Sequence, residues 1–260
     1  MYILTVNCGS SSLKLDVIDT QTQQSVTELK AERLPEDRDI TLNGKTLTYT
    51  GELLFPSILS FCLEAVKQDL IDKTISGIGH RVVHGGDKYY QPVLIDEQVA
   101  KTIEDLIDLA PLHNPSNLAG IKAAQQVFPN LPNIAVFDTA FHQTLPTRAK
   151  HYAIDKEIAK KYNIKRYGFH GTSHQYVAQK TADFLKQDIK NLRILSCHLG
   201  NGASICAIEF GRSVEVSFGM TTMEGLVMGT RSGDVDPGIV TFLQQKENWT
   251  YEQVETFLNK

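Results

Sequence analysis

Two stretches far apart in the chain share one pattern, and this repeat constrains the fold more than any other feature. The first runs from Ile3 to Ile18, and the second from Ile194 to Ile208. In each, an apolar strand leads into a tight turn of glycine, serine and asparagine, and a second strand follows. Small turn residues let backbone N–H groups approach an anion closely. One such turn is typical of an ordinary hairpin, but two copies predict two similar domains that face one nucleotide.

Size and composition limit the classes of protein that this chain can belong to. Its 260 residues allow one large or two medium domains. No apolar run is long enough to span a membrane, and no basic segment followed by a long apolar stretch opens the chain, so we expect a cytoplasmic protein. A net charge of -4 argues against nucleic acid as the main partner. The cysteines lack metal-type spacing and are predicted to be reduced core thiols: Cys8, Cys62, Cys197 and Cys206.

The pattern of apolar residues and turn residues predicts an α/β fold. In the first part we expect strands over 2–6, 13–19, 24–30, 39–42, 45–50, 75–84 and 134–137. Helices are expected there over 53–71, 96–109 and 114–128, the last capped by Asn114. The second part predicts a helix over 173–185, strands over 192–197, 203–209 and 212–218, and two further helices, the first starting at Asp236-Pro237.

Domain organisation follows from the repeat. We expect one domain over 1–150 and a second over 151–260, with the junction in the polar segment 145–166. The first three-strand unit is followed by helix, strand, helix and strand, whereas the second is followed only by helices. If the two halves are related, the second lacks its last strands, so it is predicted to be incomplete.

One segment before Gly85-Gly86 predicts a site for a small acid. On a strand, Arg81 and Val83 share one face while His80 and His84 share the other. An arginine beside a small apolar side chain suits a short carboxylate, because the guanidinium pairs with the carboxylate and valine meets the alkyl group. Although the two histidines are four residues apart, strand geometry favours core or supporting histidines over zinc ligands.

Four other residues are candidates for ligand binding or catalysis, and each also has a purely structural explanation. Lys14 shares the first turn with Asn7, and the alternative is a polar hairpin with a solvated lysine. Asp138 follows an apolar strand where ligands bind in open α/β sheets, or it caps the next turn. His170 precedes a helix whose N-terminus attracts anions, or it belongs to a simple capping loop. Arg231 lies among glycines like the charge clamps of phosphoryl transfer, or it satisfies loop carbonyls.

Several motifs in this chain resemble those of the acetate kinase family, within the acetate and sugar kinase, Hsp70 and actin superfamily. The similarity runs along essentially the whole chain. The matching blocks are 7–14, 79–86, 110–115, 137–142, 170–174, 198–202 and 228–233. The resemblance implies two RNase H-like (actin-like) domains of mixed sheet flanked by helices, the second incomplete. It implies Mg²⁺-dependent, reversible phosphoryl transfer from ATP to acetate, giving acetyl phosphate and ADP, with Mn²⁺ as a second candidate ion. It also implies a homodimer for the full-length protein.

The resemblance also assigns roles to individual residues. Asn7 would help to hold the metal ion. Asp138 would be the catalytic carboxylate, and His170 and Arg231 would stabilise the transition state. The residues implied to contact ATP phosphates are Ser10, Ser12, Lys14, His198, Leu199, Gly200, Asn201 and Gly202. The residues implied to bind acetate are Arg81, Val83, Leu112, His113, Phe169 and Thr222.

The chain departs from the family pattern in two respects. Family members usually carry a proline that touches the substrate methyl, where this chain has Thr222, so a propionate or other short-chain acyl kinase is an alternative. The family also continues well beyond residue 260, through a glycine-rich adenosine loop and a Mg²⁺-binding glutamate. We therefore expect turnover only in a longer form, and a non-catalytic nucleotide-binding fragment is a third hypothesis.

Overall fold

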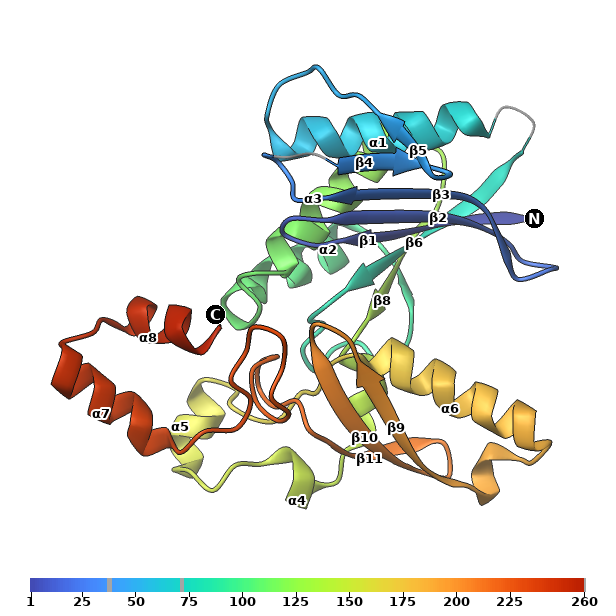
Figure 1. Ribbon diagram of the computed structural model, residues 1–260. Coiled ribbons are helices and arrows are strands. Elements are labelled where there is room, and N and C mark those ends of the chain that lie inside the picture. Colours follow the sequence, from blue (N-terminus) through green and yellow to red (C-terminus); the bar gives the residue numbers. More distant parts are fainter. Residues whose placement is uncertain (37–38, 71–72, 260) are drawn as a thin grey trace. The chain divides into compact units, whose positions relative to one another are not determined.

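The computed structural model describes residues 1–36, 39–70 and 73–259 and separates into two compact units (Figure 1). Unit 1 is Met1–Phe137 and unit 2 is Asp138–Lys260. The boundary lies ahead of the junction expected near residue 150. The physical reason is that the short helix η2 (Ala140–Thr144) packs against elements of unit 2, namely β11 and α6. Among the described helices, none is both long and apolar enough to cross a membrane.

Unit 1 is built on a mixed sheet of eight strands in the order β5-β4-β3-β2-β1-β6-β8-β7. The strands are β1 (Tyr2–Cys8), β2 (Leu13–Asp19), β3 (Gln24–Glu32), β4 (Asp39–Leu42), β5 (Lys45–Leu47), β6 (Ile75–Val82), β7 (Val93–Leu94) and β8 (Asn133–Phe137). Strands β1 to β5 form an antiparallel meander, β6 runs parallel to both β1 and β8, and β7 pairs antiparallel with β8. The carboxyl ends of these parallel strands therefore meet at one edge of the sheet.

Two helices bury the apolar face of this sheet. The helices of unit 1 are α1 (Phe55–Asp69), α2 (Glu97–Asp105), the 3-10 helix η1 (Ile107–Leu109) and α3 (Asn114–Val127). Alternate residues of β1 and β2, such as Leu4 and Leu15, are fully buried and pack with Ile58 and Leu63 of α1 and Ala124 of α3. Every second residue of the strands thus faces the helices, and residues three or four apart on the helices face the strands.

Unit 2 carries a smaller sheet of three antiparallel strands in the order β11-β10-β9. These strands are β9 (Arg193–Leu199), β10 (Ala203–Glu209) and β11 (Arg212–Val216). The other elements are α4 (Thr147–Lys150), α5 (Lys156–Lys161), α6 (Gly171–Leu185), the 3-10 helix η3 (Ile189–Asn191), α7 (Pro237–Glu247) and α8 (Tyr251–Leu258). Helix α6 packs beside β9.

Most predicted elements are confirmed, and the differences have identifiable causes. The helix expected over 96–109 changes at Leu106 into the 3-10 turn η1, and the two-residue strand β7 was not predicted. The end of the helix predicted at Ile71 lies outside the described residues. Three cysteines are buried as expected, but the prediction for Cys197 is wrong, because alternation on the edge strand β9 turns its side chain to solvent.

Candidate functional site

The first glycine-serine turn joins β1 to β2 in unit 1. The backbone N–H of Gly9 donates to the carbonyl of Ser12 at 2.8 Å, which closes the turn. A Cβ on Gly9 would lie 3.1 Å from Ser12 Oγ, so the turn leaves little room for a larger residue. Asn7 pairs directly with Lys14 across the two strands, and directly opposed residues share one face of a sheet. Ser10 in this turn and Lys14 after it are exposed.

The structure brings Arg81 to this turn. Strands β1 and β6 are parallel neighbours, and Val6 pairs with His80. Arg81 Nη1 donates to Asn7 Oδ1 at 3.2 Å. A guanidinium and an amide therefore lie together at the carboxyl ends of two parallel strands, the part of an open α/β sheet where ligands bind.

Asn117 of α3 connects the same two strand ends, and the sequence did not single it out. Its side chain accepts a hydrogen bond from the Val83 N–H at 2.9 Å and donates to the Cys8 carbonyl at 2.7 Å. Val83 lies just past the end of β6 and is 3 % exposed, while Asn117 is 4 % exposed. The only signal in the sequence is an asparagine that comes one helical turn after Asn114-Pro115.

Replacing Asn117 by alanine is expected to lower the free energy of unfolding by roughly 1–3 kcal/mol for each backbone group left without a partner. The groups are the Cys8 carbonyl and the Val83 N–H. Urea unfolding followed by circular dichroism measures this as a lower midpoint at unchanged slope. Gln125→Ala, at an exposed position of the same helix, is the matched control and should leave the midpoint unchanged. A wild-type midpoint for Asn117→Ala would contradict the bridging role.

Asn114 does not cap α3, contrary to the prediction. The N-cap is His113 and forms no side-chain cap hydrogen bond. The buried Asn114 side chain instead accepts from the His84 N–H at 3.2 Å and donates to the carbonyls of His84 and Ile103. Tertiary hydrogen bonds to the loop after β6 therefore replace the local cap. Leu112, in the turn before α3, is 56 % exposed.

The histidines of β6 and its following loop belong to the core, as predicted. His80 is 2 % exposed and its Nε2 lies 2.7 Å from Asn133 Oδ1. Burial lowers the pKa of His80 to about 4, against the opposing effect of that hydrogen bond. His84 is fully buried, and its Nδ1 accepts from the Gly86 N–H. Within the described part of the chain, no group of three or more His, Cys, Asp and Glu residues could hold a metal ion.

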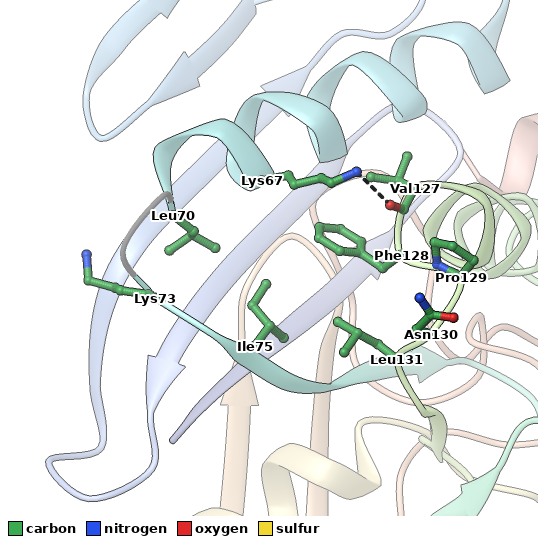
Figure 2. A pocket seen from close by; sticks show the side chains of 9 residues that line it. All are labelled: Lys67, Leu70, Lys73, Ile75, Val127, Phe128, Pro129, Asn130 and Leu131. Atoms are coloured by element: carbon green, nitrogen blue, oxygen red, sulfur yellow. Dashed lines mark hydrogen bonds between the residues drawn. The ribbon is translucent and has the colours of Figure 1, made fainter.

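A surface pocket of unit 1 lies at the other end of the parallel strands (Figure 2). It is lined by the end of α1, the start of β6 and the segment before β8, with Lys67, Leu70, Ile75, Phe128 and Leu131 among its residues. Figure 2 shows the Lys67 ammonium donating to the Val127 carbonyl, at 3.0 Å. The amino ends of parallel strands are not where α/β sheets bind ligands, so this pocket is not the candidate site.

In unit 2, a turn before α6 presents Phe169 and His170. Gly168 has a φ of +72°, and a Cβ there would lie 2.7 Å from Val216. A Cβ on Gly171 would lie 2.2 Å from the Asp138 carbonyl oxygen, which accepts from the Gly171 N–H. Only glycine fits at these two positions. Between them Phe169 is 1 % exposed, and His170 takes a left-handed conformation with a φ of 56°.

Asp138 is tied to the same turn. It is 1 % exposed, and the Thr172 hydroxyl donates to its Oδ1 at 3.3 Å. Its backbone carbonyl accepts a hydrogen bond from the Gly171 N–H at 2.9 Å. Both contacts tie Asp138 to the turn before α6 rather than to Thr139-Ala140, the turn that the plainer alternative expected it to cap.

The second glycine turn packs against His170 and Arg231. A Cβ on Gly202 would lie 3.0 Å from Arg231 Nη2 and 3.6 Å from His170 Cε1. The His170 ring stacks on His198 with centroids 3.9 Å apart, and His198 Nδ1 lies 2.9 Å from Ser173 Oγ. A glycine turn, a guanidinium and an imidazole thus lie together in unit 2.

The loop that carries Arg231 is held from two sides. Arg231 Nη1 donates to the Thr222 carbonyl, as the plainer alternative for this arginine expected. The other terminal nitrogen, Nη2, lies beside Gly202. Burial lowers the pKa of the Arg231 guanidinium. The Gly229 N–H donates to the Asn201 carbonyl at 3.1 Å, which joins the arginine loop to the second turn. Leu199, at the entry to that turn, is 72 % exposed.

His142 supports the turn at residues 168–171 and was not singled out as a site residue. Its Nε2 lies 2.9 Å from the Phe169 carbonyl and its Nδ1 2.8 Å from Ser213 Oγ. Because a carbonyl only accepts, Nε2 carries the ring proton. Burial lowers the pKa of His142 to about 4, so the ring is neutral near pH 7. Its position in the block 137–142 was the only signal in the sequence.

These features define a class: an α/β protein in which each unit has an arginine close to a glycine-containing turn, with His170 beside the turn of unit 2, a combination of groups suited to anionic ligands. The family model described as the acetokinase family matches residues 2–260. The chain therefore belongs to the acetokinase family.

Known relatives agree with this assignment. The chain is 47% identical to the acetate kinase of Desulfitobacterium hafniense over 273 residues, covering 100% of this chain and 68% of that protein. It is 48% identical over 276 residues to the acetate kinase of Caldanaerobacter subterraneus subsp. tengcongensis, covering 100% of this chain and 67% of that protein.

Solved structures confirm the α/β fold class. A propionate kinase from Francisella tularensis matches with a TM-score of 0.93 and 41% identity, covering 100% of this chain and 68% of that one. The Porphyromonas gingivalis acetate kinase matches with a TM-score of 0.90 and 39% identity, covering 100% and 67%. The chain thus spans about two thirds of the length of these relatives.

Proposed function

We propose that the chain is an acetate kinase, which transfers the γ-phosphoryl group of ATP reversibly to acetate and yields acetyl phosphate and ADP. The observation that carries this proposal is the packing of His170 and Arg231 around the Gly202 turn. Two side chains that can donate to anionic oxygens and a turn without side-chain bulk suit a phosphoryl group. Membership of the acetokinase family supports the same reaction.

Each group has a role that its chemistry allows. Acetate is ionised at neutral pH and is already a nucleophile, so no base has to deprotonate it. Arg81 pairs with the acetate carboxylate through charge-assisted hydrogen bonds. His170 and Arg231 neutralise charge on the phosphoryl group during in-line transfer, and Asp138 acts mainly through the metal ion and through positioning. Val83, Leu112, His113, Phe169 and Thr222 complete the proposed acid site.

The nucleotide and its metal ion would be held by few protein groups. ATP or ADP phosphates would contact the turns at Ser10, Ser12 and Lys14 and at 198–202. A divalent cation, Mg²⁺ with Mn²⁺ as a second candidate, would neutralise phosphate charge when bound. Asn7 offers an amide oxygen, which is a suitable hard ligand, and Mg²⁺ usually takes only one or two protein oxygens beside phosphates and water.

The assembly and location are proposed on the family resemblance. We expect a homodimer in the cytoplasm. The net charge of -4 argues against nucleic acid as the main partner.

Propionate is a second candidate substrate. Thr222 replaces the proline usual in the family at the substrate methyl, and a propionate kinase is among the similar solved structures. A change at the methyl-contacting position alters the room for the alkyl group, and one methylene shifts selectivity by about 10–200-fold. The ratio of kcat/KM for acetate and for propionate decides between the two acids.

Arg81→Lys is expected to raise the KM for the acid by about 10–100-fold and to leave the KM for ATP unchanged, because lysine cannot form the paired contact with a carboxylate. The assay traps the acyl phosphate with hydroxylamine in the presence of ATP, Mg²⁺ and acetate or propionate. Variants are compared in a form that continues past residue 260, because turnover is expected only there. Arg33→Lys is the matched control, since that side chain is 64% exposed.

The outcomes of this assay separate the hypotheses. Acetyl hydroxamate formed by the longer form supports the proposal, and a clear preference for propionate supports the second candidate. Turnover by the 260-residue chain would contradict the expectation that only a longer form is active. Nucleotide binding without any acyl phosphate would contradict kinase activity and would favour a non-catalytic nucleotide-binding fragment.

A further inference from the structure

A chain of hydrogen bonds runs from His170 into the interior of unit 2. His170 Nδ1 lies 2.9 Å from Ser204 Oγ, and the same oxygen lies 2.9 Å from His174 Nε2. His174 Nδ1 in turn lies 2.9 Å from Ser196 Oγ. Ser204 and His174 are fully buried and Ser196 is 2 % exposed. The members of this chain therefore depend on one another for hydrogen bonds.

The elements of unit 2 bring these four residues together. His174 lies one turn along α6 from His170, the residue that precedes the helix. Strands β9 and β10 pair so that Ser204 lies opposite His198 and Ser196 opposite Cys206. Because α6 packs beside β9, both serines reach the same face of the helix. The arrangement is tertiary, which is why spacing in the sequence did not reveal it.

The number of protons limits how these hydrogen bonds can point. A serine hydroxyl has one proton, so Ser204 can donate to His170 or to His174 but not to both. Burial above all lowers the pKa of His174 to about 4, so this ring is neutral near pH 7 and carries one proton. When Ser204 donates to one ring, the hydrogen bonds point either toward His170 or away from it. When both rings donate to Ser204 Oγ, His170 carries its proton on Nδ1, as it does when the bonds point away.

The proposed function selects the direction. Because Nδ1 of His170 faces Ser204, a neutral His170 ring can donate to a phosphoryl oxygen only from Nε2, and its Nδ1 must then accept a hydrogen bond. We infer that Ser204 is a positioning residue: its hydroxyl donates to His170 Nδ1 and holds His170 in the tautomer with the proton on Nε2. His174 Nε2–H donates to Ser204 Oγ, and the Ser196 hydroxyl donates to His174 Nδ1. This inference rests on the proposed function for the choice of direction.

Neighbouring groups fix the rest of the His170 geometry. The ring stacks on His198, and the Phe218 ring lies 4.9 Å away between centroids. His142 holds the Phe169 carbonyl just before His170. These contacts restrict the position of the ring, but they do not choose which nitrogen carries the proton. Ser204 Oγ, 2.9 Å from Nδ1, is a hydrogen-bond partner that can make this choice.

Ring-nitrogen NMR of the chain labelled with [15N]histidine tests the inference directly. We expect a pyrrole-type shift for His170 Nε2 and a pyridine-type shift for Nδ1 near pH 7.5, with His170→Asn identifying the signals. Ser204→Ala should shift both nitrogens toward averaged values, and Ser204→Thr, which keeps a hydroxyl, should restore them. Ser213→Ala removes a comparable serine contact from His142 and should leave the His170 signals unchanged.

The wild-type spectrum alone can overturn the inference, whether or not the variants fold. A pyridine-type Nε2 in wild-type His170 would show that the chain points the other way, and a wild-type His170 spectrum in Ser204→Ala would remove any role for Ser204. In the trapping assay, Ser204→Ala should lower kcat about tenfold with little change in KM for acetate, as outer partners of functional histidines do. Absence of acyl phosphate from the wild type would count against the proposed function, whereas the tautomer is read without turnover.

Discussion

Arg231→Lys is expected to lower kcat for acyl phosphate formation by about 10³-fold or more, the scale on which an arginine stabilises transferring phosphoryl groups. The guanidinium is anchored through one nitrogen on the Thr222 carbonyl and presents the other beside Gly202. Lysine offers a single ammonium group and cannot serve both places at once. Hydroxylamine trapping with saturating ATP and acetate measures the effect.

A matched substitution isolates the role of this arginine. Arg193→Lys makes the same change at an exposed position of β9, where the side chain pairs with Glu209 at 3.1 Å. This variant should keep wild-type turnover. If Arg231→Lys retains more than about a tenth of the wild-type kcat, Arg231 does not stabilise the transition state on the scale of an arginine clamp.

Asp138→Asn is expected to cut turnover by about 10²–10³-fold while acetate binding persists. Asparagine has nearly the same shape, and its amide oxygen can still accept from the Thr172 hydroxyl, so the turn before α6 should survive. The lost negative charge removes the proposed interaction with the metal ion, whereas Arg81, the proposed partner of the acid, is unchanged. Acetate affinity is measured by calorimetry and turnover by trapping.

The control for this charge removal is Asp155→Asn. Asp155 caps α5 by accepting from the Ile158 N–H, and asparagine is an equally good cap. Its turnover should equal that of the wild type. An equal loss of acetate binding and turnover in Asp138→Asn would show that this carboxylate shapes the acid site itself.

Much of the architecture was predictable because local periodicity decides it. The apolar segments and the tight turns between them predicted both hairpin units correctly, and burial alternates along β1 and β2 in the structure. The apolar run before Asp138 forms the parallel strand β8, as its composition indicated. These features depend on neighbours in sequence, so a single chain reveals them.

The supporting residues could not be predicted in the same way. Asn117 and Ser204 act through partners that only the folded chain brings close, such as Cys8 for the former and His174 for the latter. The sequence around Asn114 predicted a helix cap, but in the folded chain its side chain forms hydrogen bonds with the backbone of His84 instead. The exposure of Cys197 likewise depends on β9 being an edge strand.

The hydrogen bond between Arg81 and Asn7 has a consequence for how two ligands influence each other. A divalent cation on the Asn7 oxygen would be repelled by a guanidinium bound to the same atom. An acid that draws Arg81 away therefore frees that oxygen, and a metal-nucleotide complex that claims the oxygen frees Arg81. Linkage requires each to raise the affinity for the other by the same factor. With the roles proposed for Asn7 and Arg81, this one side-chain contact in unit 1 would make the two substrates mutually cooperative.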